Sequence, residues 1–134
     1  MAIKLNFARQ FTKVAYVEVA AADLAGLSGQ AQIAIKLPPG SIVTGGALVV
    51  TTAFNSATSD ALVVGDASVA NRYLASTSIA AAGRTALTAP GFVTAGGQPA
   101  INVTWTGVGA APSAGSFRLE VHYIGRGVAD FTQD

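Results

Sequence analysis

The sequence of 134 residues is 51% hydrophobic and only 11% charged, carries a formal net charge of +1 and contains no cysteine. Its length suits one domain with a buried core, and the missing cysteines exclude disulfides, thiolate metal sites and cysteine nucleophiles. The small net charge argues against direct binding to nucleic acid, which needs clustered lysine and arginine. Because charged residues usually make up about 25% of a soluble domain, we expect other protein to cover part of this surface.

The N-terminal region is basic and aromatic. It carries Lys4, Arg9 and Lys13, and no acidic residue occurs before Glu18. Because Lys4 and Arg9 interrupt the apolar residues, we predict no signal peptide. No uncharged apolar window of about 18 residues predicts a transmembrane helix. We therefore expect no membrane partner, and a protein made and used in the cytoplasm or in a particle assembled there.

Three strands are predicted in the first 54 residues. Apolar and polar residues alternate over residues 13–20 and 30–37, which is typical of half-buried strands. One face of the second strand is expected to hold Ala31, Ile33, Ile35 and Leu37. Residues 41–54 predict a longer strand, in which Gly45 and Gly46 indicate a bulge or a bend where the strand passes from one sheet to another.

The same alternation continues to the end of the chain. Further strands are predicted at residues 60–66, 72–75, 84–88, 101–107 and 116–126. About eight strands with turn-rich connections indicate an all-β fold, an antiparallel jelly-roll-like β-sandwich. We expect this sandwich to span residues 13–126, between an N-terminal arm (1–12) and a C-terminal tail (127–134).

The segment VVGDASVANRYLA, residues 63–75, raises the question of a ligand site. An aspartate after a glycine favours an Asx turn, so Asp66 predicts a corner between two strands. Arg72 is expected to make a structural or inter-subunit contact, with Asp60 or Asp66 as its partner. A calcium site built from Asp60, Asp66 and Asn71 is the alternative, but it would need a denser run of acids and a closing glutamate. We predict no metal site.

Catalytic patterns are missing from the sequence. The single histidine, His122, lies on the polar face of its predicted strand, and one histidine without cysteines makes a poor zinc site. There is no nucleophile elbow and no phosphate-binding loop. Glu18 and Glu120 would need to face each other to serve as paired carboxylates. We therefore predict no enzyme, no catalytic residue and no cofactor.

Carbohydrate binding is an alternative function, because jelly rolls can bind sugars on aromatic side chains. The available rings are those of Tyr16, Tyr73, Trp105 and Tyr123. Alternation places Trp105 and Tyr123 on core-facing sides of their strands, so few rings remain for a sugar platform.

Several motifs resemble a known family. The runs LPPGSIVTGG, VGDASVANRYLA and AGSFRLEVHYI, in this order between about Lys36 and Phe131, are similar to the small cement or decoration proteins of tailed-bacteriophage capsids. The resemblance implies a jelly-roll body and a non-enzymatic virion protein on the capsid exterior. Its implied partner is the major capsid protein of an HK97-like icosahedral shell, whose neighbouring subunits it would clamp as a homo-oligomer, a dimer or a trimer.

Six residues are predicted to contact the capsid or a partner subunit: Lys4, Phe7, Arg9, Phe11, Arg72 and Phe131. The aromatic residues of the arm would be buried when the arm is ordered on a neighbouring subunit, at about 1.5–3 kcal/mol for each ring, less the entropy lost on ordering. Another virion component, such as a tail, fibre or head-completion subunit, is the alternative within the same resemblance.

Overall fold

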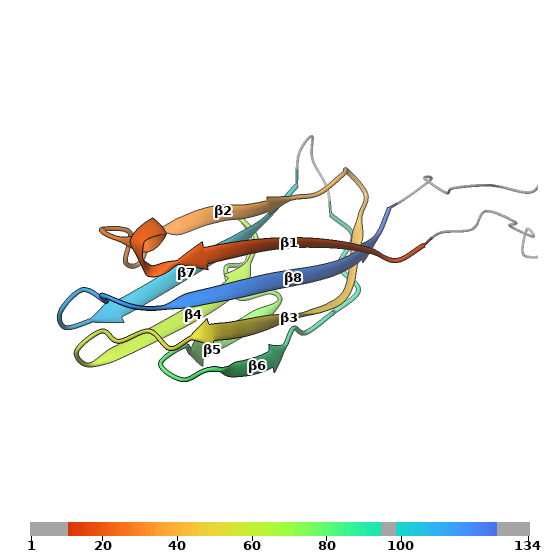
Figure 1. The fold of residues 1–134 in the computed structure, drawn as a ribbon. Coiled ribbons are helices and arrows are strands. Elements are labelled where there is room, and N and C mark those ends of the chain that lie inside the picture. The colour runs from red at the N-terminus through yellow and green to blue at the C-terminus, as the bar shows by residue number, and fades with distance from the viewer. Residues whose placement is uncertain (1–10, 95–98, 126–134) are drawn as a thin grey trace, which may run out of the picture.

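The computed structural model describes residues 11–94 and 99–125. Over these residues the protein is a sandwich of two four-stranded antiparallel sheets (Figure 1). The first sheet has the order β1-β8-β3-β6 and the second the order β2-β7-β4-β5. The strands are β1 (Lys13–Ala20), β2 (Ala31–Lys36), β3 (Ile42–Thr52), β4 (Ser59–Gly65), β5 (Leu74–Ser78), β6 (Gly83–Ala86), β7 (Ala100–Val108) and β8 (Ser116–Ile124).

This strand order confirms the predicted sandwich. The chain passes back and forth between the two sheets, so that β1 and β8 pair in one sheet while β2 and β7 pair in the other. Eight antiparallel strands in two interleaved sheets are the arrangement of a jelly roll. A single 3-10 turn, η1 (Ala21–Leu24), follows β1.

The core lies between the sheets and is made of side chains that alternate inward from both. In β8, Phe117, Leu119 and Val121 are at most 1% exposed, as the sequence pattern predicts. The ring of Phe117 packs against Phe54 with a centroid separation of 6.0 Å. Trp105 of β7 is also buried, which confirms its predicted place in the core.

The predicted bulge in β3 is present, but β3 does not change sheets. The pairing with β8 shifts between Val43 and Gly45, and β3 then continues in the same sheet to Thr52. Gly46 has a φ of +140°, and a Cβ atom there would collide with the carbonyl oxygen of Glu120. Gly46 therefore allows a close approach of two neighbouring strands within one sheet, whereas a Cβ atom at Gly45 would meet no atom within 4 Å.

The prediction for β2 was partly wrong. Its pairing with β7 shifts between Ile33 and Ile35, so Ala34 is an extra residue in the ladder. A one-residue shift moves the following side chains to the opposite face. Ile33 is therefore 63% exposed on the outside, while Ile35 lies in the core at 7%.

The short strands in the middle of the chain are displaced from their predicted positions. β5 begins at Leu74, two residues after the predicted start, because residues 66–73 form a hydrogen-bonded turn. β6 begins at Gly83 and ends at Ala86. Nearly all of the predicted arm and the whole predicted tail lie outside the described residues, and both stay predictions.

Candidate interaction surface

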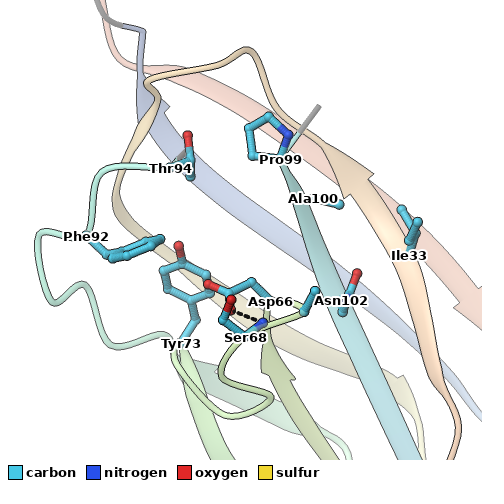
Figure 2. A pocket seen from close by; sticks show the side chains of 10 residues that line it. Ile33, Asp66, Ser68, Tyr73, Phe92, Thr94, Pro99, Ala100 and Asn102 are labelled. Carbon is cyan, nitrogen blue, oxygen red and sulfur yellow. Dashed lines mark hydrogen bonds between the residues drawn. The ribbon is translucent and has the colours of Figure 1, made fainter. Parts of the chain in front are cut away.

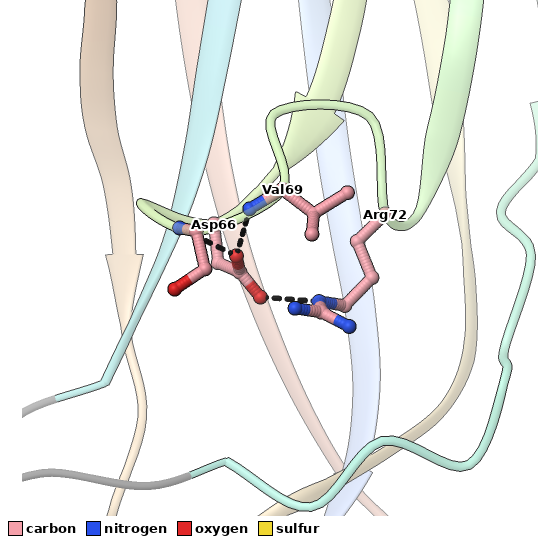
Figure 3. Close-up of polar contacts among 4 residues, drawn as sticks. Asp66, Val69 and Arg72 are labelled. Atoms are coloured by element: carbon pink, nitrogen blue, oxygen red, sulfur yellow. Dashed lines mark hydrogen bonds and ion pairs between the residues drawn. The ribbon is translucent and has the colours of Figure 1, made fainter.

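Arg72 and Asp66 form the ion pair that closes the turn between β4 and β5 (Figure 3). The backbone N–H groups of Ser68 and Val69 donate to Oδ1 of Asp66, at 2.9 and 2.7 Å, and the Nε of Arg72 donates to Oδ2. The predicted Asx turn is thus confirmed, and Asp66 is the structural partner of Arg72. Asp60, the other predicted partner, lies at the far end of β4.

The electrostatics of this turn favour an ionised Asp66. Partial burial would raise the pKa of its carboxyl group, but the hydrogen bonds from Val69, Arg72 and Ser68 outweigh this and hold the pKa below its ordinary value of 3.8. The side chains of Arg72 and Asp66 are only 18% and 17% exposed. The charges of the pair therefore cancel within the turn.

Arg72 also joins this turn to the loop before β7. Its guanidinium carbon lies 3.6 Å from the ring centroid of Phe92, within the range of a cation–π interaction. One face of the Phe92 ring is covered by this contact. Arg72 therefore holds the Asp66 turn against the loop that contains Phe92.

A pocket of about 370 Å³ opens beside the Asp66 turn (Figure 2). Its lining comes from β2, β7, the Asp66 turn and the loop before β7, and consists of Ile33, Asp66, Ala67, Ser68, Tyr73, Phe92, Thr94, Pro99, Ala100 and Asn102. Three buried polar atoms in this lining have no hydrogen-bond partner among the described residues: Tyr73 Oη, Thr94 Oγ1 and Asn102 Oδ1. Burial, and secondarily the negative charge of Asp66, raises the pKa of Tyr73 above 10.0, although Arg72 opposes this.

The outer face of the second sheet is almost free of charge, and we call it the uncharged face. The strands of this sheet contain two charged residues, Asp60, which is buried at 2%, and Lys36 at the end of β2. The strand register places small or uncharged side chains outward in adjacent rows. They include Ala31, Ile33, Ala61, Val63, Asn102, Thr104 and Thr106.

The first sheet carries its charges on its outer face. Arg118 of β8 lies between two acids, with its Nε 3.1 Å from Glu120 and its Nη1 3.9 Å from Glu18. Its guanidinium carbon also lies 4.0 Å from the ring centroid of Tyr16. Glu18 and Glu120 therefore each pair with Arg118, and the register sets Glu18 opposite Arg118. The two acids do not form an opposed carboxylate pair.

Of the predicted contact residues in the arm and the tail, the structure describes only Phe11. Its side chain, two residues before the start of β1, is 59% exposed, and Val14 and Tyr16 of that strand are 54% and 57% exposed. Lys4, Phe7, Arg9 and Phe131 lie outside the described residues. Their predicted contacts with a capsid stay predictions, as does a contact of Arg72 with another subunit.

The structure does not support the alternative sites for sugar or metal binding among the described residues. Trp105 is 5% exposed and donates to Asp60, so it forms no sugar-binding platform. The described part of the chain contains no group of three or more histidine, aspartate or glutamate residues placed to hold a metal ion. Within that same part, no helix is long and apolar enough to cross a membrane.

Sequence reasoning missed the pocket. The alternation of Ile101, Val103 and Trp105 does place Asn102 on the opposite, outward side of its strand, but nothing in it indicates a pocket. Thr94 precedes a turn-rich run without periodicity, and nothing in the sequence pairs it with Tyr73. The pocket exists because the loop before β7 returns to the Asp66 turn.

The structure is similar to three solved chains from phage capsids. A chain of the cyanophage Pam1 capsid asymmetric unit is 28% identical with a TM-score of 0.68, and the match covers 93% of this chain and 91% of that one. A chain of the acid-stable capsid of Helicobacter pylori bacteriophage KHP30 is 15% identical, with a TM-score of 0.66 and coverages of 91% and 93%. A chain of the Ralstonia phage GP4 capsid is 17% identical, with a TM-score of 0.61 and coverages of 96% and 92%.

No protein-family model matches the sequence, and no curated protein matches it. The structural similarities nevertheless extend over nearly the whole length of each chain. The protein therefore has the fold of a phage capsid-related structural protein.

Proposed function

We propose that this protein is a capsid decoration, or cement, protein. It binds the outer surface of an HK97-like icosahedral shell and clamps neighbouring major capsid subunits. The similarity to phage capsid chains supports a place in the virion. The motif resemblance supports the decoration role, and the uncharged face supplies a surface for it.

The observation that carries the proposal is the contrast between the outer faces of the two sheets. Charged groups must lose their hydration when a surface is buried, and the cores of protein interfaces are accordingly depleted of charge. The uncharged face offers small or uncharged side chains on β2, β4 and β7, with one lysine at the end of β2. It can be covered by another protein at little desolvation cost.

The opposite face carries a cluster of charged side chains. Arg118, Glu120 and Glu18 form a charged cluster there, and Arg84 of β6 is exposed. Exposed ion pairs of this kind add little stability but keep a surface solvated. We infer that the uncharged face points toward the shell and the charged face toward solvent.

The arm supplies a second contact in this proposal. Residues 1–12 would reach a neighbouring subunit, starting from the exposed Phe11. The sandwich and the arm would each make a modest contact. When both contacts form together and are repeated in a dimer or trimer, the overall affinity for the shell rises through avidity.

The test uses shells assembled without this protein, to which the purified full chain is added. A matched pair of variants places one new lysine on either face: Ala31→Lys on β2 and Ala86→Lys on β6, both at exposed edge-strand positions. A third variant, Thr104→Lys, places the charge at the centre of the uncharged face. Co-sedimentation measures binding, and electron microscopy locates the bound protein.

Ala31→Lys and Thr104→Lys are expected to weaken binding at least about tenfold, which corresponds to about 1.4 kcal/mol. Ala86→Lys is expected to bind like the unmodified protein. Equal binding of all three variants would contradict the assignment of the uncharged face. Density found only at the tail or portal would replace the decoration role by that of another virion component.

A further inference from the structure

We propose that the pocket beside the Asp66 turn receives an uncharged, amide-bearing segment of a shell subunit. This inference rests on the proposed decoration function and adds a specific recognition site to it. The pocket opens at the end of the uncharged face and shares Ile33, Ala100 and Asn102 with that face. A protein seated on the uncharged face would therefore also cover the pocket.

The unpartnered polar atoms indicate that the pocket is built to be filled. Tyr73 is 1% exposed and Thr94 is 7% exposed, yet the hydroxyl groups of both lack a partner among the described side chains and backbone groups. Buried polar groups in native proteins are nearly always hydrogen-bonded. A group that has lost its contact with water and has no other partner lowers the stability of the fold. Three such atoms around one pocket point to a common partner.

The hydrogen-bonding capacity of these atoms fits an amide. Asn102 Oδ1 can only accept, whereas the hydroxyl groups of Tyr73 and Thr94 can donate. The pKa of Tyr73 lies above the ordinary value of 10.0, so its hydroxyl is protonated and can donate at neutral pH. A backbone peptide group or the side chain of asparagine or glutamine offers one carbonyl acceptor and at least one N–H donor.

The charge of the lining argues for an uncharged occupant. Asp66 is the one ionised side chain among the described lining residues, and Arg72 neutralises it. An incoming carboxylate, phosphate or ammonium group would lose its hydration and find no free opposite charge. A neutral amide meets no such penalty.

The surroundings favour a protein segment over a glycan. Sugars are commonly bound against an open aromatic ring, but Tyr73 is buried and one face of Phe92 is covered by Arg72. The rim instead carries Ile33, which is 63% exposed. An exposed apolar side chain next to a surface without charges suits the buried core of a protein–protein interface, which is depleted of charged residues.

The decisive variant is Tyr73→Phe, which removes only the unpartnered hydroxyl. Since this hydroxyl has no partner in the isolated protein, the midpoint of urea unfolding should stay unchanged or rise. Binding to shells assembled without the protein should weaken about three- to tenfold, as expected for one lost hydrogen bond. Thr94→Val should behave in the same way. Tyr16→Phe, on the outer face of the first sheet, is the matched control and should leave binding unchanged.

Asn102→Asp tests the neutrality of the occupant. This nearly isosteric change adds a negative charge and should weaken binding at neutral pH more than Asn102→Ala does. Tighter binding of Asn102→Asp would overturn the proposal, because it would indicate a cationic occupant. A midpoint lowered by Tyr73→Phe would also overturn it, because the hydroxyl would then have an internal partner.

The remaining outcomes separate this inference from the proposed function. Normal binding of Tyr73→Phe and Thr94→Val to shells that bind the unmodified protein would overturn the pocket assignment alone. Failure of the unmodified protein to bind shells would overturn both proposals. A glycan-array signal that is lost in Tyr73→Phe would reassign the pocket to a sugar.

Discussion

Trp105 of β7 and Asp60 of β4 are joined inside the sandwich by a hydrogen bond of 2.9 Å from the indole Nε1 to the carboxylate Oδ1. Asp60 is 2% exposed. Its carboxylate also accepts from the N–H and the hydroxyl of Ser56, at 2.8 and 2.6 Å. Three donors thus stabilise a carboxylate that has little access to water. They link β4 to the neighbouring strand β7 and to the loop that precedes β4.

The first prediction concerns this buried carboxylate. Asp60→Asn replaces one accepting oxygen by an NH₂ group, which would face a donor of Ser56 or Trp105. We expect the free energy of unfolding to fall by about 1–3 kcal/mol, the usual cost of a buried polar group left without a partner. Urea unfolding followed by fluorescence measures the change directly, because Trp105 is the single tryptophan of the chain.

Ser59→Ala is the matched control for this prediction. Ser59 is the exposed neighbour of Asp60 in β4, and its change should alter the stability by at most about 0.5 kcal/mol. An Asp60→Asn variant as stable as the control would show that the carboxylate contributes nothing to the fold.

The second prediction is a pH dependence that arises from Asp66. Because the pKa of Asp66 is lowered in the folded protein, its contribution to stability is present above the ordinary value of 3.8 and is lost as the pH falls through the lower, folded value. Asp66→Asn keeps an oxygen for the turn but loses the ion pair with Arg72. We expect this variant to be less stable by about 1–3 kcal/mol at pH 7.

The difference between the two proteins should shrink as the pH falls below 3.8. Urea unfolding at a series of pH values from 7 to the acid range measures it. A difference that stays constant over this range would show that ionisation of Asp66 does not stabilise the turn.

Much of the fold could be predicted from alternation, because each sheet has one buried and one exposed face. The inward positions of Phe117 and Leu119 follow from this pattern, and the glycines of β3 indicate its bulge. The bulge at Ala34 could not be predicted, since no glycine or proline marks it. The exposure of Ile33 depends on this bulge.

The candidate surface was less predictable for a physical reason. The Asx turn of Asp66 is encoded by neighbouring residues, and its partner Arg72 follows only six positions later in the sequence. The pocket instead combines Tyr73, Thr94 and Asn102, which come from separate segments. Their proximity depends on how the loop before β7 crosses the end of the second sheet, and local patterns carry no information on that crossing.

The third prediction concerns Gly65, the last residue of β4. A Cβ atom at this position would collide with the backbone of Val69 and Ala70, so the close return of the Asp66 turn requires a glycine. Gly65→Ala should displace this turn and lower the free energy of unfolding by about 1–3 kcal/mol. Gly45→Ala is the control, because a Cβ there meets no atom within 4 Å, and its effect should stay near zero. Similar stabilities of the two variants would contradict this explanation.

The fourth prediction tests the arm. Removing residues 1–12 leaves β1 intact from Lys13, so the midpoint of urea unfolding should not change. Binding to shells should weaken at least about tenfold, because burial of Phe7 and Phe11 would be lost, at about 1.5–3 kcal/mol for each ring before the entropy of ordering is subtracted. Phe11→Ser should cause part of this loss. Full occupancy of the shell by the truncated protein, measured by co-sedimentation, would show that the body alone makes the contact and that the exposed ring of Phe11 faces solvent.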